Sequence, residues 1–205
     1  MSRLLVTGFG RFPGAPANPT QALVAALARR RRPALAGIEL ITAVLPVTWA
    51  GAPAQLRELI AAHRPDAVLM FGLAGRARRL RIECRAVNRG ESLRADAAGR
   101  VHAGGGLDPA GPNARLVRGS MMRLRRAIAE TGAPVVLSRD AGTYLCNAAL
   151  WTALAATPKD LPVAFIHVPP LMRRLPKRRL RRPRPDLGMV ARASIAALIV
   201  LARPR

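Results

Sequence analysis

Apolar runs alternate with stretches of helical periodicity along most of the chain, and this alternation is the feature that most constrains the fold. Continuous apolar runs of strand length are typical of buried strands, whereas apolar residues spaced three and four apart are typical of helices that cover a sheet. Strands that alternate with helices favour a largely parallel sheet with both faces covered, an α/β fold. The predicted strands are 4–6, 38–45, 67–71, 80–87, 135–137 and 163–168, and the predicted helices are 20–30, 54–63, 120–130, 144–155 and 186–201.

Two segments show neither pattern. Residues 88–112 are polar and rich in glycine, and loops of this length are often functional. Residues 169–185 are basic and rich in proline, and we expect this segment to be locally mobile. No internal repeat or domain linker interrupts the chain, so we expect a single domain over residues 1–205. Thr20 is the predicted N-cap of the first helix.

The composition fits a globular protein in a reducing compartment. With 205 residues, half of them hydrophobic, the chain can bury a substantial core. Cys84 and Cys146 are too few for a disulfide framework, and the first residues lack the pattern of a cleaved leader. The longest apolar stretch near the C-terminus, residues 195–202, is far shorter than the roughly 20 residues that cross a bilayer. We therefore expect a cytoplasmic protein that does not bind membranes.

The formal net charge is +23, from 34 basic and 11 acidic residues, and such a charge usually suggests a nucleic-acid partner. Only Lys159 and Lys177 are lysines, so 32 of the basic residues are arginine. Arginine together with abundant alanine, glycine and proline is typical of a GC-rich genome. Aromatic residues make up only 3% of the chain and no recognised nucleic-acid motif is present. We therefore favour the compositional explanation over nucleic-acid binding.

Cys146 is the first candidate for chemistry, because residues 141–147 place it where a strand-like segment turns into a helix. A helix N-terminus carries unpaired N–H groups and partial positive charge, which favour the thiolate, the form that attacks a carbonyl carbon. The alternative is a buried, inert thiol. Gly142 and Asn147 favour a turn that exposes a functional group, so we interpret Cys146 as a nucleophile.

His167 directly follows the apolar run 163–166 and is the candidate base for this thiol. The alternative is a core histidine whose ring binds a backbone carbonyl. Glu83 is the candidate carboxylate to orient the ring, and its alternative is a surface ion pair with Arg81 or Arg85. Spacing alone does not decide between these interpretations.

The candidate segments follow apolar strands, and ligands of open α/β sheets bind beyond the carboxyl ends of strands. We therefore expect the loop 8–19, residues 72–75, the turn before Cys146, and His167 to meet at one edge of the sheet. Two cysteines and three scattered histidines offer no ligand pair at zinc spacing, so no metal site is predicted. Residues 8–14 break the dinucleotide-binding pattern with bulky residues and a proline.

Four sequence blocks, taken in order, resemble the pyroglutamyl peptidase I family, also called pyrrolidone-carboxylate peptidases. Each block alone is only moderately specific for the family, but the four blocks in family order are strong evidence for the resemblance. The blocks are residues 5–12 with 18–20, residues 45–47, residues 72–75 leading to Glu83, and residues 141–147 with 165–169.

The resemblance implies a cysteine exopeptidase that hydrolyses N-terminal pyroglutamyl residues through an acyl-thioenzyme, with Cys146, His167 and Glu83 as its triad. It implies a three-layer α/β/α sandwich, no cofactor, and a homo-oligomer, often a tetramer. Family aromatic residues of the first loop and those just before the cysteine enclose the lactam ring. The corresponding substrate-binding residues here are Phe9, Phe12, Tyr144 and Leu145.

Several positions depart from the family pattern. Arg11 and Pro13 stand where proline and glycine are usual, and an ungapped count places Leu93, with Arg94 beside it, where a substrate-site arginine is common. Cys84 has no assigned role. A rival hypothesis is that the chain is a catalytically degenerate homologue that binds RNA or another polyanion. A third hypothesis is an amidohydrolase or transferase that uses the same thiol on another small amide.

Overall fold

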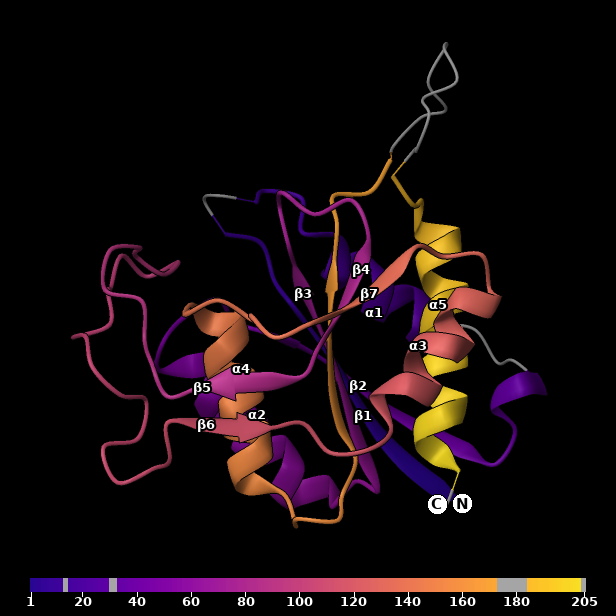
Figure 1. Cartoon of the computed structure of the whole chain (residues 1–205), viewed down its shortest axis with the longest axis horizontal. Helices are drawn as coiled ribbons and strands as arrows, with labels where there is room; N and C mark the ends of the chain where they lie inside the picture. The colour runs from indigo at the N-terminus through magenta and orange to yellow at the C-terminus, as the bar shows by residue number, and fades with distance from the viewer. Residues whose placement is uncertain (13–14, 30–32, 173–183, 204–205) are drawn as a thin grey trace.

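The computed structural model describes residues 1–12, 15–29, 33–172 and 184–203, in which helices cover both faces of a central sheet (Figure 1). The predicted segment 169–185 lies largely outside these residues, as does Pro13. The elements are β1 (Ser2–Phe9), α1 (Pro19–Ala28), the 3-10 turn η1 (Pro33–Leu35), β2 (Ile38–Leu45), α2 (Gly51–His63), β3 (Ala67–Leu73), β4 (Leu80–Glu83), β5 (Arg85–Val87), β6 (Ala114–Leu116), α3 (Met121–Glu130), β7 (Val135–Ser138), α4 (Leu145–Ala156), β8 (Val163–Val168) and α5 (Leu187–Ala202).

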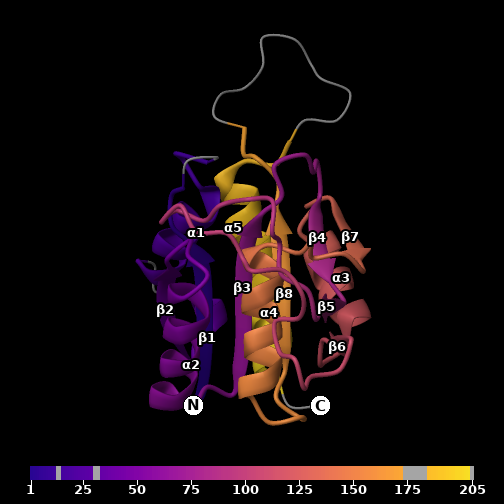
Figure 2. The ribbon, with the colours of Figure 1, turned by 90° about the vertical axis from the view of Figure 1, so that its left-hand side faces the viewer.

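The main sheet has the strand order β2-β1-β3-β8-β4-β7, which the labels of Figure 2 follow from left to right. Strands β2, β1, β3 and β8 run parallel, whereas β4 pairs with β8 in the antiparallel sense and β7 runs parallel to β4. The largely parallel α/β sheet is therefore confirmed. The two strands at one side run opposite to the other four.

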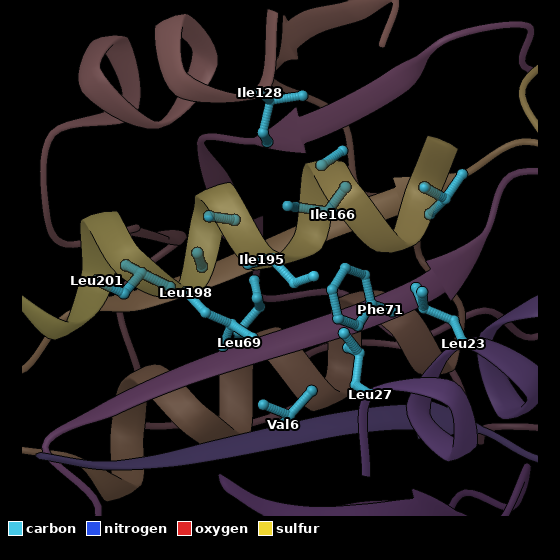
Figure 3. Close-up of a cluster of buried hydrophobic side chains, with 14 of the residues drawn as sticks. Val6, Leu23, Leu27, Leu69, Phe71, Ile128, Ile166, Ile195, Leu198 and Leu201 are labelled. Carbon is cyan, nitrogen blue, oxygen red and sulfur yellow. The ribbon is translucent and has the colours of Figure 1, made fainter. Parts of the chain in front are cut away.

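Two hydrophobic layers fix the helices on the sheet. Helices α1, α3 and α5 pack on one face, where Leu23, Ile128 and Leu198 belong to one buried cluster with Leu69, Ile166 and other sheet residues (Figure 3). Helices α2 and α4 pack on the opposite face, and the two-stranded ribbon β5-β6 lies against α4. This is the three-layer α/β/α arrangement that the resemblance implies.

The pleat of the sheet decides which side chains reach α4. Successive side chains of a strand point to opposite faces. Ile166 of β8 and Ile82 of β4 lie in the layer of α5, whereas Phe165 lies in the layer of α4. His167 and Glu83, one position further along their strands, therefore point to the α4 side.

Local structure differs from prediction at three places. Asn18, not Thr20, is the N-cap of α1: its side chain accepts from the Thr20 N–H, while the Thr20 hydroxyl accepts from the Phe9 N–H, 3.0 Å away. The predicted strand 80–87 is two strands, because the chain passes at Cys84 from the main sheet to the β5-β6 ribbon. Strand β6 lacks a distinctive pattern and was not predicted.

In the described part of the chain, no helix is both long enough and apolar enough to span a bilayer.

Candidate active site

The N-terminus of α4 presents Cys146. Gly142 adopts a left-handed conformation, with φ of 77°, in the turn that precedes the helix. Tyr144 is the N-cap in an extended conformation, and its side chain makes no capping hydrogen bond. The first N–H groups of the helix are therefore free of side-chain caps and can donate to an anion. Cys146, the second helical residue, lies among them.

Gly72 of β3 makes room for the thiol. A β-carbon at this position would lie 2.7 Å from the Cys146 Sγ and 2.7 Å from the ring of Phe165. Real β-carbons do not approach that closely, so any side chain here would displace the sulfur or the ring. The glycine that closes the apolar run 67–71 is therefore a steric requirement of the site.

His167 and Glu83 form a buried pair. The His167 Nδ1 lies 2.8 Å from the Glu83 Oε1, and the two residues are 6% and 0% exposed. A carboxylate only accepts hydrogen bonds, so Nδ1 carries the proton and donates it, which leaves Nε2 for another partner. The partner of this ring is thus a carboxylate rather than a backbone carbonyl.

The electrostatic surroundings of His167 favour the imidazolium. Burial lowers its pKa, but Cys146, through its charge and a hydrogen bond, and then Glu83 raise the pKa from its usual 6.5 to about 9. A negative group beside the ring favours its protonated form, and a cation beside a sulfur in turn favours a thiolate. A thiolate–imidazolium pair is an activated nucleophile with a proton donor next to it.

Arg81 contacts the same carboxylate oxygen as His167. Its Nε lies 3.3 Å from the Glu83 Oε1, and its terminal nitrogen donates to the Ser138 hydroxyl and the Asp140 carbonyl, each 2.7 Å away. Glu83 is therefore not a surface ion pair, because its buried carboxylate contacts both the histidine and Arg81. Arg85 instead donates to the carbonyl of Arg139.

The antiparallel direction of β4 explains how the site is assembled. Arg81 is opposite His167 and Glu83 is opposite Phe165, so Glu83 lies level with the third residue before the end of β8. Strand β7 ends at the level of Glu83. The turn before Cys146 therefore reaches the site from a strand that runs opposite to β3 and β8. The segments expected to meet do so, since Phe9, Leu73, Tyr144 and His167 line one pocket.

A small pocket of about 180 Å³ opens at the thiol. It is smaller than the cavities of about 300 Å³ and above that hold drug-sized ligands, so it suits a compact group. The four residues expected to contact substrate are all in its walls, and no carboxylate is. The lining residues in the described chain are Phe9, Phe12, Asn18, Val47, Leu73, Arg94, Ala141, Tyr144, Leu145, Cys146 and His167.

Arg94, which the sequence left unassigned, enters this pocket. Its guanidinium carbon lies 5.2 Å from the ring centre of Phe12 and 4.7 Å from that of Tyr144, distances typical of cation–π contacts. The Tyr144 hydroxyl donates to the carbonyl of Ala95, 2.9 Å away. Leu93, the ungapped counterpart of the family arginine, is 92% exposed.

Two buried polar residues hold the surrounding loops, and sequence reasoning did not find this role for either of them. Asp96 accepts from the backbone N–H groups of Trp49, Ala98 and Arg100, and these bonds hold its pKa below the usual value despite burial. Asn147 exchanges hydrogen bonds with the backbone of Val87 and so ties α4 to β5. Their partners are distant in sequence, and no local pattern reveals them.

Among the described residues, no group of three or more His, Cys, Asp or Glu side chains could hold a metal ion. Cys84 is half-buried at the junction of β4 and β5, with its thiol 3.8 Å from the carbonyl of Ile82.

Comparison with known proteins gives a consistent result. A family model described as pyroglutamyl peptidase matches residues 2–202. The pyrrolidone-carboxylate peptidase of Thermococcus onnurineus is 32% identical over 190 residues, which cover 91% of this chain and 91% of that protein. That of Mycobacterium tuberculosis is 34% identical over 175 residues, 82% and 78% of the two chains. The crystal structure of pyrrolidone carboxyl peptidase from Thermus thermophilus is similar with a TM-score of 0.85 at 37% identity, covering 97% of this chain and 100% of that chain.

Proposed function

The chain belongs to the pyroglutamyl peptidase family, cysteine-type peptidases that remove an N-terminal pyroglutamate, and we propose that it does so with Cys146, His167 and Glu83. Cys146 is the nucleophile, His167 transfers the proton, and Glu83 orients the imidazole. The observation that carries the proposal is the buried hydrogen bond of 2.8 Å between Glu83 and His167, beside the pocket that contains the Cys146 thiol.

The first step forms an acyl-thioenzyme. The Cys146 sulfur attacks the carbonyl carbon of the pyroglutamyl residue, and the carbonyl oxygen becomes an oxyanion. Backbone N–H groups at the start of α4 stabilise this oxyanion, a contribution worth about 3 kcal/mol for each donor. His167 then gives its Nε2 proton to the leaving amine, the carbon–nitrogen bond breaks, and the acyl group stays on the sulfur.

The second step releases the acyl group. His167, now neutral, takes a proton from water, and the resulting hydroxide attacks the thioester carbon. The carbon–sulfur bond breaks, pyroglutamate leaves as the free acid, and the thiolate and imidazolium pair is restored. Glu83 stays charged throughout, and it fixes the tautomer of His167 and stabilises the imidazolium.

The pocket suits an uncharged, cyclised N-terminus. Phe9, Phe12, Tyr144 and Leu145 supply apolar walls for the lactam ring, and no carboxylate is present to bind an ammonium group in the described part of the pocket. Arg94 supplies the polar contact, because its guanidinium can donate to the lactam carbonyl while it rests on the two aromatic rings.

Arg81 positions the carboxylate. It connects Glu83 to the Asp140 carbonyl in the turn that leads to Cys146, so one guanidinium links the carboxylate to the segment carrying the nucleophile. Burying a charged carboxylate is costly unless cations and hydrogen bonds surround it. Arg81 supplies one of the two cations, and the imidazolium supplies the other.

The family resemblance also supports a homotetramer and a cytoplasmic location. Light scattering on the purified protein tests the first proposal, and cell fractionation tests the second.

Hydrolysis of a pyroglutamyl-aminomethylcoumarin substrate tests the proposed activity. We expect turnover by the intact protein, loss of turnover in Cys146→Ser and His167→Ala, and faster labelling of Cys146 than of Cys84 by iodoacetamide. Absence of turnover by the intact protein, together with salt-sensitive RNA binding, would instead favour the degenerate polyanion-binding homologue.

A further inference from the structure

A second, larger hollow of about 1030 Å³ lies beside the candidate active site. It shares Asn18 and Leu73 with the pocket that contains the thiol, so the two spaces are adjacent. Its other walls are mostly apolar and come from the loop before α1, from α1 itself, and from the chain between β8 and α5. Its apolar walls include Leu73, Pro170, Leu171, Met172 and Leu187.

The chemistry of the proposed reaction decides which part of a substrate faces this hollow. The lactam ring occupies the pocket, and the leaving amine must lie at His167, which donates the proton. Gly72 pairs with His167 and Leu73 with Val168 in the sheet. The chain continues from these pairs toward the hollow, because Gly75 and Pro170 lie just beyond them and line it, as Leu73 does. The chain that follows the scissile bond therefore extends over Leu73.

Arginines gather on this exit side. Arg11 lines the hollow, and Gly75 is shared with a neighbouring depression whose walls include Arg76, Arg78 and Arg79. In the described chain, none of these four arginines has a carboxylate within 4.0 Å, and no Asp or Glu lines either space. A guanidinium without an acidic partner binds carboxylates by charge and by paired hydrogen bonds.

We propose that this exit groove, formed by the apolar hollow and its arginine rim, binds the peptide that follows pyroglutamate and selects acidic peptides. An apolar residue directly after pyroglutamate fits against Leu73 and Leu171, and carboxylates at the next positions, including a C-terminal one, meet the arginines. The inference rests on the proposed function, since it requires the scissile bond to lie between Cys146 and His167.

The expected selectivity is moderate and depends on salt. An exposed pair of opposite charges changes an equilibrium by about two- to fivefold, so two pairs give a preference of about tenfold in kcat/KM. The arginines are exposed, so added salt screens the attraction and the preference disappears at high ionic strength.

The test uses three amidated peptides of one length, pyroglutamyl-Leu-Glu-Glu, pyroglutamyl-Leu-Gln-Gln and pyroglutamyl-Leu-Lys-Lys. We expect kcat/KM to fall in that order by about tenfold overall at an ionic strength of about 0.02 M, and to become nearly equal at about 0.5 M. Hydrolysis of the small, uncharged pyroglutamyl-aminomethylcoumarin should not depend on salt in this way.

Two variants locate the effect. Arg78→Gln combined with Arg79→Gln should reduce the preference for the acidic peptide to about threefold or less. Ala22→Glu, on the exposed face of α1 within the groove, should disfavour the acidic peptide. The matched control, Arg123→Gln with Arg125→Gln, removes the same charge from exposed positions of α3 and should leave the preference intact.

Equal rates for the Glu and Lys peptides at low ionic strength would overturn the inference, while hydrolysis of all three would still support the proposed function. An equal loss of preference in the α3 control would also overturn it, because net charge rather than the groove would then be responsible. If none of the three peptides is hydrolysed, the proposed function falls and the inference falls with it.

Discussion

Glu83→Gln isolates the charge of the buried carboxylate. The amide keeps the shape of the side chain and can still accept from the His167 Nδ1, but it no longer balances two neighbouring cations. Arg81 then faces a neutral amide 3.3 Å from its Nε and repels the imidazolium instead of sharing a carboxylate with it. The pKa of His167, about 9 in the native protein, should therefore fall.

Turnover should fall as well. The same carboxylate-to-amide change in a serine peptidase triad costs about 10⁴-fold, because the ring adopts the wrong tautomer. A preformed thiolate does not need a base for its first step, so we expect about 10²- to 10⁴-fold in kcat/KM here. The basic limb of the pH–rate profile, set by loss of the imidazolium, should move to lower pH, and thermal unfolding should verify that the variant is folded.

A double-mutant cycle with Arg81→Met extends the test. If Arg81 acts through the carboxylate, its removal should reduce kcat/KM in the native background and change it little in the Glu83→Gln background. An unchanged rate and pH profile in Glu83→Gln would remove the carboxylate from the mechanism. Additive effects in the cycle would show that Arg81 acts elsewhere.

Three further predictions follow from the site. Gly72→Ala should lower kcat by more than about 10²-fold while costing only about 1–3 kcal/mol of stability, because the new β-carbon displaces the Cys146 sulfur; rates and urea unfolding measure both. Arg94→Met should raise KM about tenfold more than it lowers kcat, as full Michaelis curves would show, since the contact with bound lactam is lost. The raised pKa of His167 contributes about 3 kcal/mol to the free energy of unfolding; this contribution is complete below pH 6.5 and is lost as the pH rises through about 9. Urea unfolding between these pH values should show the decline, and Cys146→Ala, which lacks the thiolate, should flatten it.

The sequence predicts most elements because their signal is local. Strand β2 and helix α2 are recognisable from residues close to each other. The start of α4 at Leu145 follows from the turn before it and from the change from a strand-like to a helical pattern of apolar residues. The candidate nucleophile depends only on that local transition. For this reason Cys146 could be identified before any tertiary contact was known.

What the sequence does not predict depends on distant contacts. Nothing in residues 80–87 shows that β4 runs antiparallel to β8, or that the chain changes sheets at Cys84. From the sequence alone, Glu83 fits a surface ion pair as well as a partner of the histidine, and only its burial in the structure decides between the two. Asp96 and Asn147 look like ordinary loop and helix polar residues, although each binds backbone groups far away in the sequence.

The position of β8 has a consequence for synthesis of the chain. It is the last strand in sequence but lies in the interior of the sheet, between β3 and β4, and its His167 meets a carboxylate 84 residues earlier. A nascent polypeptide that stops before residue 163 can form at most two separate half-sheets. Contacts of such long range close late. The emerging chain should therefore stay inert on the ribosome, and regained hydrolysis after dilution from denaturant should report the final event of refolding.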